Sequence, residues 1–315
     1  MATEGFWTIG GVVGKLRTEQ GITVRQLSRG ICSVVTLSRI EMNKRDMDMM
    51  MAEMIFERLG YTPDKYEIYT GPEELERYQQ REEILQLAEK DEFQKLEEAV
   101  EQYETQNREK LTCLEQQFVK GIKGFAKWKL GDVETAEILV EQALNVTVPP
   151  ENGAWVVQAV LSEKELNLLW LLSEIYREQG KKADAFHLVY QIFQYFEQSE
   201  ERKKQVTNIY VQIVIRLTEF LLNDGETKRA YEACLKAVLM LRTEKKLSGL
   251  AEIIEWKGIC EEKLEKEEKI ATGTSRGSYM RAYYLYLTLD RPEEADRVKA
   301  HLEELGQWES IWKEK

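Results

Sequence analysis

Apolar residues near the start of the chain recur at the spacing of two short helices. Leu27 and Ile31 lie four positions apart, and Leu37 and Ile40 lie three apart, so each pair shares one helix face. Only five residues separate the two pairs, which suits a tight turn. Residues 21–44 are therefore predicted to form two helices joined by a tight turn and packed together through these four side chains.

The residues around this pair of helices predict a small domain. Thr23 and Ser33 precede the two helices and are good N-cap residues. Apolar residues at helical spacing predict a preceding helix over 9–20 and a following helix over 46–59. Several short helices within residues 1–66 are typical of a lambda-repressor-like helix-turn-helix domain, which inserts its second helix into the DNA major groove.

The second helix leaves small and basic side chains on its outer face. Arg39 can bind a guanine through two hydrogen bonds, whereas Val34 and Val35 can only contact thymine methyl groups. Flanking basic residues are suited to phosphate contacts, which set affinity but not sequence preference. A helix-turn-helix hairpin also occurs in proteins that never bind DNA, so that alternative stays open. The residues expected to contact DNA are Arg17, Arg25, Ser33, Val34, Val35, Thr36, Arg39, Lys44 and Arg45.

The rest of the chain repeats a long helical pattern, a turn and a second helix. Three turns, at 130–136, 179–185 and 224–230, contain a Gly followed five residues later by an Ala. Gly suits the left-handed end of the first helix, and Ala allows the second helix to pack closely. Related segments lie at 88–99 and 290–295. The sequence therefore predicts an all-α chain, in which the helix-turn-helix domain precedes a right-handed α-solenoid of degenerate tetratricopeptide-like hairpins.

The concave face of such a solenoid is lined by the outer side of each first helix. The residues on this face predict a peptide-binding site. Asn and Gln amides can bond both the donor and the acceptor of a peptide unit, and aromatic walls can hold apolar side chains. The same aromatic residues can instead form core between neighbouring hairpins, and both readings stand. The residues expected to bind the peptide are Phe125, Trp128, Asn167, Trp170, Glu174, Arg177, Asn208, Gln212 and Glu219.

The charge is distributed unevenly along the chain. The formal net charge is −12, of which residues 1–66 carry +1 and the remainder −13. An acidic body repels DNA, which leaves the N-terminal segment as the expected DNA-binding face. No apolar run approaches the roughly 18 residues of a membrane span, and we expect no secretory signal before the first helix. We expect a cytoplasmic protein that makes no membrane contact.

The sequence contains none of the common catalytic motifs. The two histidines, His187 and His301, lie far apart and have no metal-ligand spacing. No GxGxxG, phosphate-binding loop or GxSxG motif occurs. We expect no enzyme activity, no metal and no cofactor.

The segments GICSVVTLSRIEMNKR (30–45) and ERLGYTPDKYE (57–67) resemble the N-terminal domain of the RRNPP peptide-pheromone receptors, in particular the PlcR and Rgg branches. The resemblance extends over the whole chain, because members of this family carry a tetratricopeptide-like domain after the DNA-binding one. Two departures stand out. Val24 replaces a glutamine common at the start of the first helix, and Val34 and Val35 make the DNA-reading face unusually apolar.

The resemblance implies a quorum-sensing transcription regulator with two domains. Residues 1–66 would bind double-stranded DNA, and residues 67–315 would bind a short signalling peptide and form a homodimer. Family members hold the peptide backbone with asparagines, which points to Asn167 and Asn208. The alternative is a scaffold that binds a protein partner in its groove and carries a helix-turn-helix that no longer binds DNA.

Overall fold

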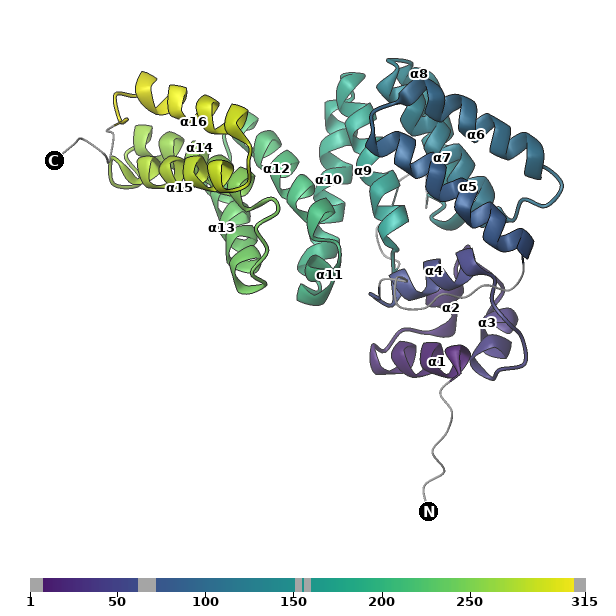
Figure 1. The fold of residues 1–315 in the computed structure, drawn as a ribbon. Helices are drawn as coiled ribbons and strands as arrows, with labels where there is room; N and C mark the ends of the chain where they lie inside the picture. Colours follow the sequence, from purple (N-terminus) through teal and green to yellow (C-terminus); the bar gives the residue numbers. More distant parts are fainter. Residues whose placement is uncertain (1–7, 62–71, 151–154, 156–159, 309–315) are drawn as a thin grey trace. The chain divides into compact units, whose positions relative to one another are not determined.

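The computed structural model describes residues 8–61, 72–150, 155 and 160–308. These residues form sixteen α-helices and no strand (Figure 1), which confirms the all-α prediction. In chain order the helices are α1 (Ile9–Glu19), α2 (Val24–Ser28), α3 (Val34–Glu41), α4 (Met49–Arg58), α5 (Pro72–Glu89), α6 (Phe93–Asn107), α7 (Cys113–Lys129), α8 (Val133–Thr147), α9 (Glu163–Glu178), α10 (Lys182–Glu197), α11 (Glu200–Gln205), α12 (Thr207–Asn223), α13 (Thr227–Thr243), α14 (Leu250–Lys266), α15 (Thr274–Thr288) and α16 (Pro292–Glu304).

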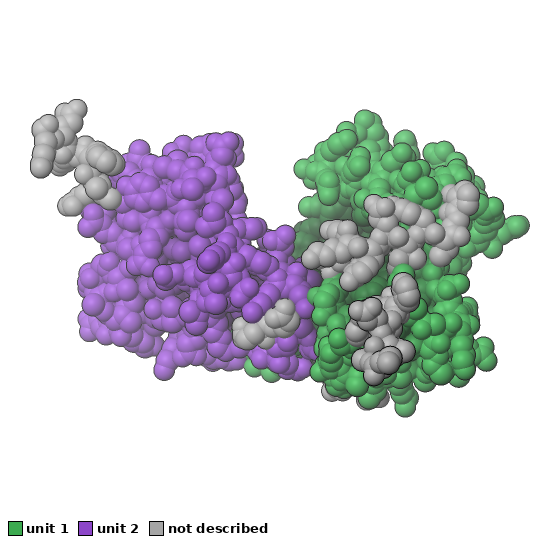
Figure 2. Space-filling model, turned by 60° about the horizontal axis from the view of Figure 1, so that its bottom comes forward, with its two compact units in different colours: residues 1–195 green, residues 196–315 purple. Residues whose placement is uncertain are grey.

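The chain divides into two compact units, Met1–Tyr195 and Phe196–Lys315 (Figure 2). The first unit holds α1 to α9 and most of α10, and the second holds the helices that follow. The domain boundary predicted at residue 66 lies outside the described residues and stays a prediction. None of the described helices combines the length and the apolar character needed to cross a lipid bilayer.

Helices α1 to α4 begin where the sequence provides capping side chains. The Thr23 hydroxyl accepts a hydrogen bond from the backbone N–H of Gln26, and the Gln26 side chain accepts one from the Thr23 backbone. At the starts of α3 and α4, the Ser33 and Asp48 side chains accept hydrogen bonds from the backbone N–H groups of Thr36 and Met51. The α4 cap explains why this helix begins at Met49, later than the predicted residue 46.

The core of these four helices is formed by the residues that the spacing predicted. Leu27, Ile31, Leu37 and Ile40 are all buried. Met50, Met54, Ile55 and Leu59 of the α4 region join the same cluster. The two helices of the hairpin therefore pack through their shared apolar faces, as predicted.

The three predicted Gly–Ala turns connect α7 to α8, α9 to α10 and α12 to α13. Their glycines have positive φ angles, which a residue with a side chain adopts only under strain. The alanines are completely buried where the second helix meets the first. The residues concerned are Gly131, Gly180 and Gly225 with φ angles of 88°, 76° and 77°, and Ala136, Ala185 and Ala230.

Two further hairpins use an aspartate in place of the turn glycine. Asp91 joins α5 to α6 and Asp290 joins α15 to α16, each with φ 56°. Aspartate tolerates the left-handed conformation better than most residues because its short polar side chain can bond locally. Ala295 is fully buried after the second turn. The segments predicted at 88–99 and 290–295 are therefore copies of the same turn.

Tyrosines form much of the core at the end of the second unit. Tyr279 and Tyr286 on α15 are buried, and their hydroxyls donate to Glu262 and Glu255 of α14 at 2.9 and 2.6 Å. Burial of the phenol raises the pKa of Tyr279 above its usual range, and the negative charge of Glu262 adds to the shift. These hydroxyls therefore stay protonated and join α14 to α15.

Candidate functional site

The outer face of α3 is exposed at its N-terminal end. Val34 and Val35 are 45 % and 59 % exposed, while Leu37 and Ile40 face the core. Ser33 accepts a hydrogen bond from the Thr36 backbone N–H at 3.0 Å, which holds the first turn of the helix. The N-terminal residues of a recognition helix are those that reach base edges. We call Val34, Val35, Thr36 and Arg39 the reading face.

Exposed basic side chains lie on α3 and on the segments next to it. Arg39 belongs to the reading face, Arg25 to α2, and Lys44 and Arg45 follow α3, and all four are exposed. The Arg45 guanidinium also donates to the Thr36 hydroxyl at 3.4 Å. These four positive groups lie where a helix-turn-helix places its phosphate and base contacts.

Arg17 takes a different position from the other predicted DNA contacts. Its Nε and Nη2 atoms donate to the Glu41 carboxylate at 2.6 and 3.0 Å, and its Nη1 donates to the Ile22 carbonyl at 2.8 Å. The Arg17 and Glu41 side chains are both mostly buried. In this structure Arg17 therefore joins α1 to the end of α3.

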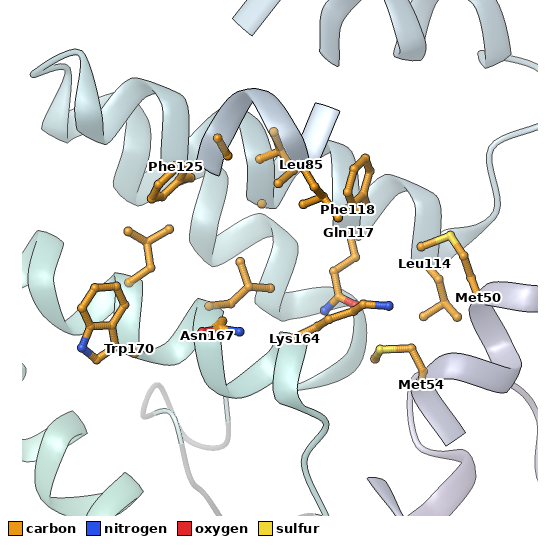
Figure 3. A pocket seen from close by; sticks show the side chains of 15 residues that line it. Met50, Met54, Leu85, Leu114, Gln117, Phe118, Phe125, Lys164, Asn167 and Trp170 are labelled. Carbon is orange, nitrogen blue, oxygen red and sulfur yellow. The ribbon is translucent and has the colours of Figure 1, made fainter. Parts of the chain in front are cut away.

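A cavity of about 310 Å³ lies between α4, α5, α7 and α9 within the first unit (Figure 3). Figure 3 shows Met50 and Met54 at one end and Trp170 at the other, with Gln117, Lys164 and Asn167 between them. All the other lining residues are apolar or glycine. The lining consists of Met50, Met54, Leu85, Ala88, Leu114, Gln117, Phe118, Gly121, Ile122, Phe125, Lys164, Asn167, Leu168, Trp170 and Leu171.

Three predicted peptide contacts meet at this cavity. Phe125, Asn167 and Trp170 line it, and Asn167 is exposed. Among the described residues, no hydrogen bond reaches the Asn167 side chain. Trp128 lies behind Trp170, with ring centroids 6.3 Å apart and an edge-to-face geometry. The Lys129 ammonium lies 4.4 Å from the centre of the Trp128 ring, so this aromatic face already holds a cation.

The other predicted contacts on α9 lie outside the cavity lining. Glu174 is buried, with a side chain only 4 % exposed, and it accepts hydrogen bonds from Arg177 at 3.2 and 3.3 Å. Counting helix positions from the turn predicted an open groove position for Glu174. Residues 171–176 of α9 are all buried, so neighbouring parts of the fold cover this stretch of the helix on every side.

Three predicted contacts belong to α12 in the second unit. Asn208 and Gln212 are exposed and share one helix face. The Asn208 carbonyl oxygen accepts a hydrogen bond from the Ser248 hydroxyl at 3.2 Å. Glu219 forms an ion pair with Arg216 one turn away. None of the three lines the cavity of the first unit.

Helices α4 and α5 also contribute to the cavity, which the sequence did not predict. Met50 and Met54 were predicted as core, and they also line the cavity. Leu85 and Ala88 of α5 are four and one residues before the helix end and received no role. The pair of methionines one turn apart was the available signal, because Met adapts to irregular gaps and binding surfaces.

A buried ion pair joins the helix-turn-helix to the repeats beside the cavity. Arg58 of α4 donates to the Glu165 carboxylate of α9 at 2.6 and 3.2 Å, and both side chains are almost fully buried. Arg58 also donates to the carbonyls of Leu27 and Arg29 at the end of α2, at 2.9 and 2.7 Å. The Ser162 backbone donates to Glu165 at 2.7 Å.

The network satisfies both charges of this pair. Burial alone would raise the pKa of Glu165, but the charge and hydrogen bonds of Arg58 outweigh burial and leave that pKa below its ordinary value. Glu165 is therefore ionised when buried. Arg58 in turn completes the hydrogen bonding of α2, which is only five residues long.

A second ionic contact lies at the cavity wall. Lys164 donates to Glu53 of α4 and lies 3.4 Å from Glu57 of the same helix. Gly30, in the turn between α2 and α3, approaches the end of α8 so closely that an added Cβ would lie 2.4 Å from the Cα of Thr147. The helix-turn-helix therefore contacts the repeats through α4 and through its own turn.

Comparisons with known proteins agree with this architecture. The helix-turn-helix family model matches residues 13–66, and no curated protein sequence is significantly similar to the chain. Among solved structures, Bacillus thuringiensis PlcR in its apo form has a TM-score of 0.56 and 17 % identity, covering 92 % of this chain and 97 % of that one. PlcR from the same organism in complex with the peptide PapR7 and DNA has a TM-score of 0.53 and 19 % identity, covering 92 % of this chain and 98 % of that one.

A third solved structure is the apo form of RapI, with a TM-score of 0.57 and 10 % identity, covering 72 % of this chain and 76 % of that one. At these identities the likeness concerns the fold. The resemblance to the RRNPP receptors inferred from the sequence is confirmed at that level. Residues 13–66 are a helix-turn-helix domain, and the chain shares the PlcR fold, in which tetratricopeptide-like repeats follow that domain.

Proposed function

We propose that this chain is a transcription regulator that binds DNA through α3 and is controlled by a short signalling peptide. The peptide would bind the concave side of the repeats, with the cavity of the first unit as part of the site. We place the protein in the cytoplasm as a homodimer that performs no catalysis and needs no cofactor. PlcR, whose fold the chain shares, forms a complex with a peptide and DNA, which supports this combination of partners.

One observation carries the proposal. Helix α4 packs into the helix-turn-helix core on one side, through Ile55 and Phe56, and lines the apolar cavity on the other, through Met50 and Met54. The exposed reading face and the candidate ligand site therefore share a helix within one compact unit. Such a helix can transmit the state of the cavity to the DNA-binding face.

The regulation would work through the spacing of two recognition helices. In a dimer, these helices must lie about 34 Å apart, or a multiple of that distance, to enter successive major grooves on one side of DNA. A peptide changes the population of that arrangement only if it binds one arrangement more tightly than the other. Whether the peptide promotes or prevents DNA binding depends on which arrangement it prefers.

A scaffold that binds a protein partner remains the second candidate. The observation in its favour is the apolar reading face, because the exposed Val34 and Val35 can only contact thymine methyl groups. The two candidates differ in salt dependence. DNA affinity falls steeply with salt, by a slope near −0.9 for each neutralised phosphate, whereas an apolar protein interface has no such slope.

The peptide site is tested by removing the free amide at the cavity. Heptapeptides selected from a random library on the wild-type protein are titrated by calorimetry against Asn167→Ala. Loss of one hydrogen-bonding amide is expected to weaken binding about fivefold to tenfold. Asn223→Ala is the control, because Asn223 is exposed at the end of α12. Unchanged affinity in Asn167→Ala would remove this residue from the site.

A further inference from the structure

We propose that a ligand in the cavity binds α4 and the repeats at once and so holds the helix-turn-helix in a single orientation. The inference rests on the proposed function and concerns how occupation of the site reaches the DNA-binding face. The ligand would act by direct contact with Met50 and Met54. The reading face would then respond to the ligand without any change in the curvature of the repeats.

The cavity walls come both from the helix-turn-helix domain and from the repeats. Met50 and Met54 belong to the DNA-binding domain, whereas Phe118 and Phe125 come from α7, and Leu168 from α9. Any group that fills the cavity contacts both the helix-turn-helix domain and the repeats. A ligand that contacts two bodies stabilises the arrangement in which both contacts exist.

The helix-turn-helix domain and the repeats are joined by polar and by apolar contacts. Arg58 pairs with Glu165, Lys164 adds contacts to Glu53 and Glu57, and Leu114 and Val160 pack into the helix-turn-helix core. Ion pairs of this kind add little net stability, because desolvation offsets the attraction. The apolar surface around the cavity lacks packing partners on its open side and gains dispersion contacts only when it is filled.

The cavity also indicates the chemical class of the ligand. Its volume of about 310 Å³ is roughly twice that of an apolar cavity known to hold one benzene ring. It therefore fits about two large apolar side chains. Lys164 is the charged residue of the lining, and Glu53 and Glu57 already neutralise it. Asn167 offers one amide to a backbone. We infer a short peptide with two bulky apolar side chains close together.

The arrangement so held leaves the reading face accessible to DNA. Val34, Val35 and Arg39 remain exposed while α4 contacts α7 and α9. Holding the domain in one orientation removes alternative positions of the recognition helix. In a dimer this raises the fraction of molecules whose two helices match the half-site spacing.

Binding is tested first, with the full-length protein and a defined probe. The probe is a library of acetylated, amidated pentapeptides with Leu or Phe at two positions and Gly or Ser elsewhere. A matched library carries Asn at those two positions. Native mass spectrometry is expected to detect complexes with the apolar library only. Ala88→Phe fills the cavity from α5 and is expected to reduce binding at least tenfold, whereas Gln86→Phe, exposed on the same helix, leaves it unchanged.

The mechanical step is tested by hydrogen exchange of the α4 backbone amides. At a free concentration about nine times the dissociation constant, the best pentapeptide is expected to slow opening of α4 about tenfold. Met50→Ala is expected to reduce this protection, because Met50 lines the cavity. Met51→Ala is the matched control, since Met51 lies on the same helix but outside the lining. Thermal unfolding of each variant checks that it is folded.

The outcomes separate this inference from the proposed function. Pentapeptide binding without slower exchange in α4 contradicts the inference and leaves a peptide receptor in place. Equal binding of both libraries, or binding that survives in Ala88→Phe, also contradicts it, because the cavity is then not the site. Slower exchange in α4 that is lost in Met50→Ala supports it. The proposed DNA function is decided separately, by binding to genomic fragments.

Discussion

Individual arginines in the N-terminal domain take two different roles. Arg17 and Arg58 are held by buried carboxylates and join helices together, whereas Arg25 and Arg39 are exposed beside the recognition helix. Sequence spacing assigned Arg17 to DNA together with the exposed residues. The distinction depends on Glu41, which lies 24 positions away from Arg17, so only the packed structure brings the two together.

Glu262 in the second unit is also held by hydrogen bonds, and they predict that stability depends on pH. Burial would raise its pKa, but hydrogen bonds from Lys266, His301 and Tyr279 lower it to about 2. A carboxyl whose folded pKa is depressed stabilises the fold above its unfolded pKa, and this contribution is lost as the pH falls toward the folded value. We expect Glu262→Gln to lose less stability than wild type between about pH 5 and about pH 3.

Urea unfolding at several pH values, followed by circular dichroism, measures this difference. Glu303→Gln serves as the control, because Glu303 is exposed and lies 3.9 Å from Lys299. Parallel pH profiles for wild type and Glu262→Gln would show that the carboxylate does not stabilise the folded state.

At the scale of helices, the sequence predicted turns better than it predicted side-chain positions around a helix. The Gly and Ala positions identified the turns because each has a local backbone reason. The open face of α9 was predicted less well, since Asn167 is exposed as expected but Glu174 is buried. Residue spacing gives the helix period, but neighbouring hairpins decide which face is covered. The cavity itself requires α4 and α5, whose placement no local pattern reveals.

Backbone strain in the turns is predicted to make two substitutions differ in their effect on stability. Gly180→Ala is expected to lower the free energy of unfolding by about 1–2 kcal/mol, because Gly180 has a φ angle of 76°. Space is not the cause, since no atom lies within 4 Å of an added Cβ. Asp91→Gly, at the corresponding turn between α5 and α6, is expected to change stability by less than about 0.5 kcal/mol.

Chemical denaturation of both variants and of the wild type measures these changes in the free energy of unfolding. If Gly180→Ala matched wild type, strain at the left-handed position would not explain the recurrence of glycine in these turns.

For the whole molecule, the uneven charge makes DNA binding depend on a small part of the surface. Residues 1–66 carry a net charge of +1 and the remainder −13. The described basic side chains around the reading face are therefore the expected phosphate contacts, and affinity should depend strongly on salt. Direct base readout is expected to rest mainly on Arg39, because the exposed valines offer no hydrogen bond.

The salt dependence gives a prediction for one phosphate contact. Lys44→Ala is expected to reduce the slope of log affinity against log salt by about 0.9, with little change in sequence preference. Lys95→Ala is the control, because Lys95 is exposed on α6 and pairs with Glu92. Fluorescence anisotropy with a labelled duplex at several salt concentrations measures both slopes. Equal slopes for wild type and Lys44→Ala would place Lys44 away from the phosphates.

The most direct test of the central claim is capture and sequencing of genomic DNA fragments by the wild-type protein and by Arg39→Ala. Each capture is made with and without the best apolar pentapeptide. The account predicts a two-fold symmetric motif for the wild type that is lost in Arg39→Ala, with enrichment that changes when the pentapeptide is added. No enriched motif under either condition would contradict DNA-binding regulation and favour the scaffold.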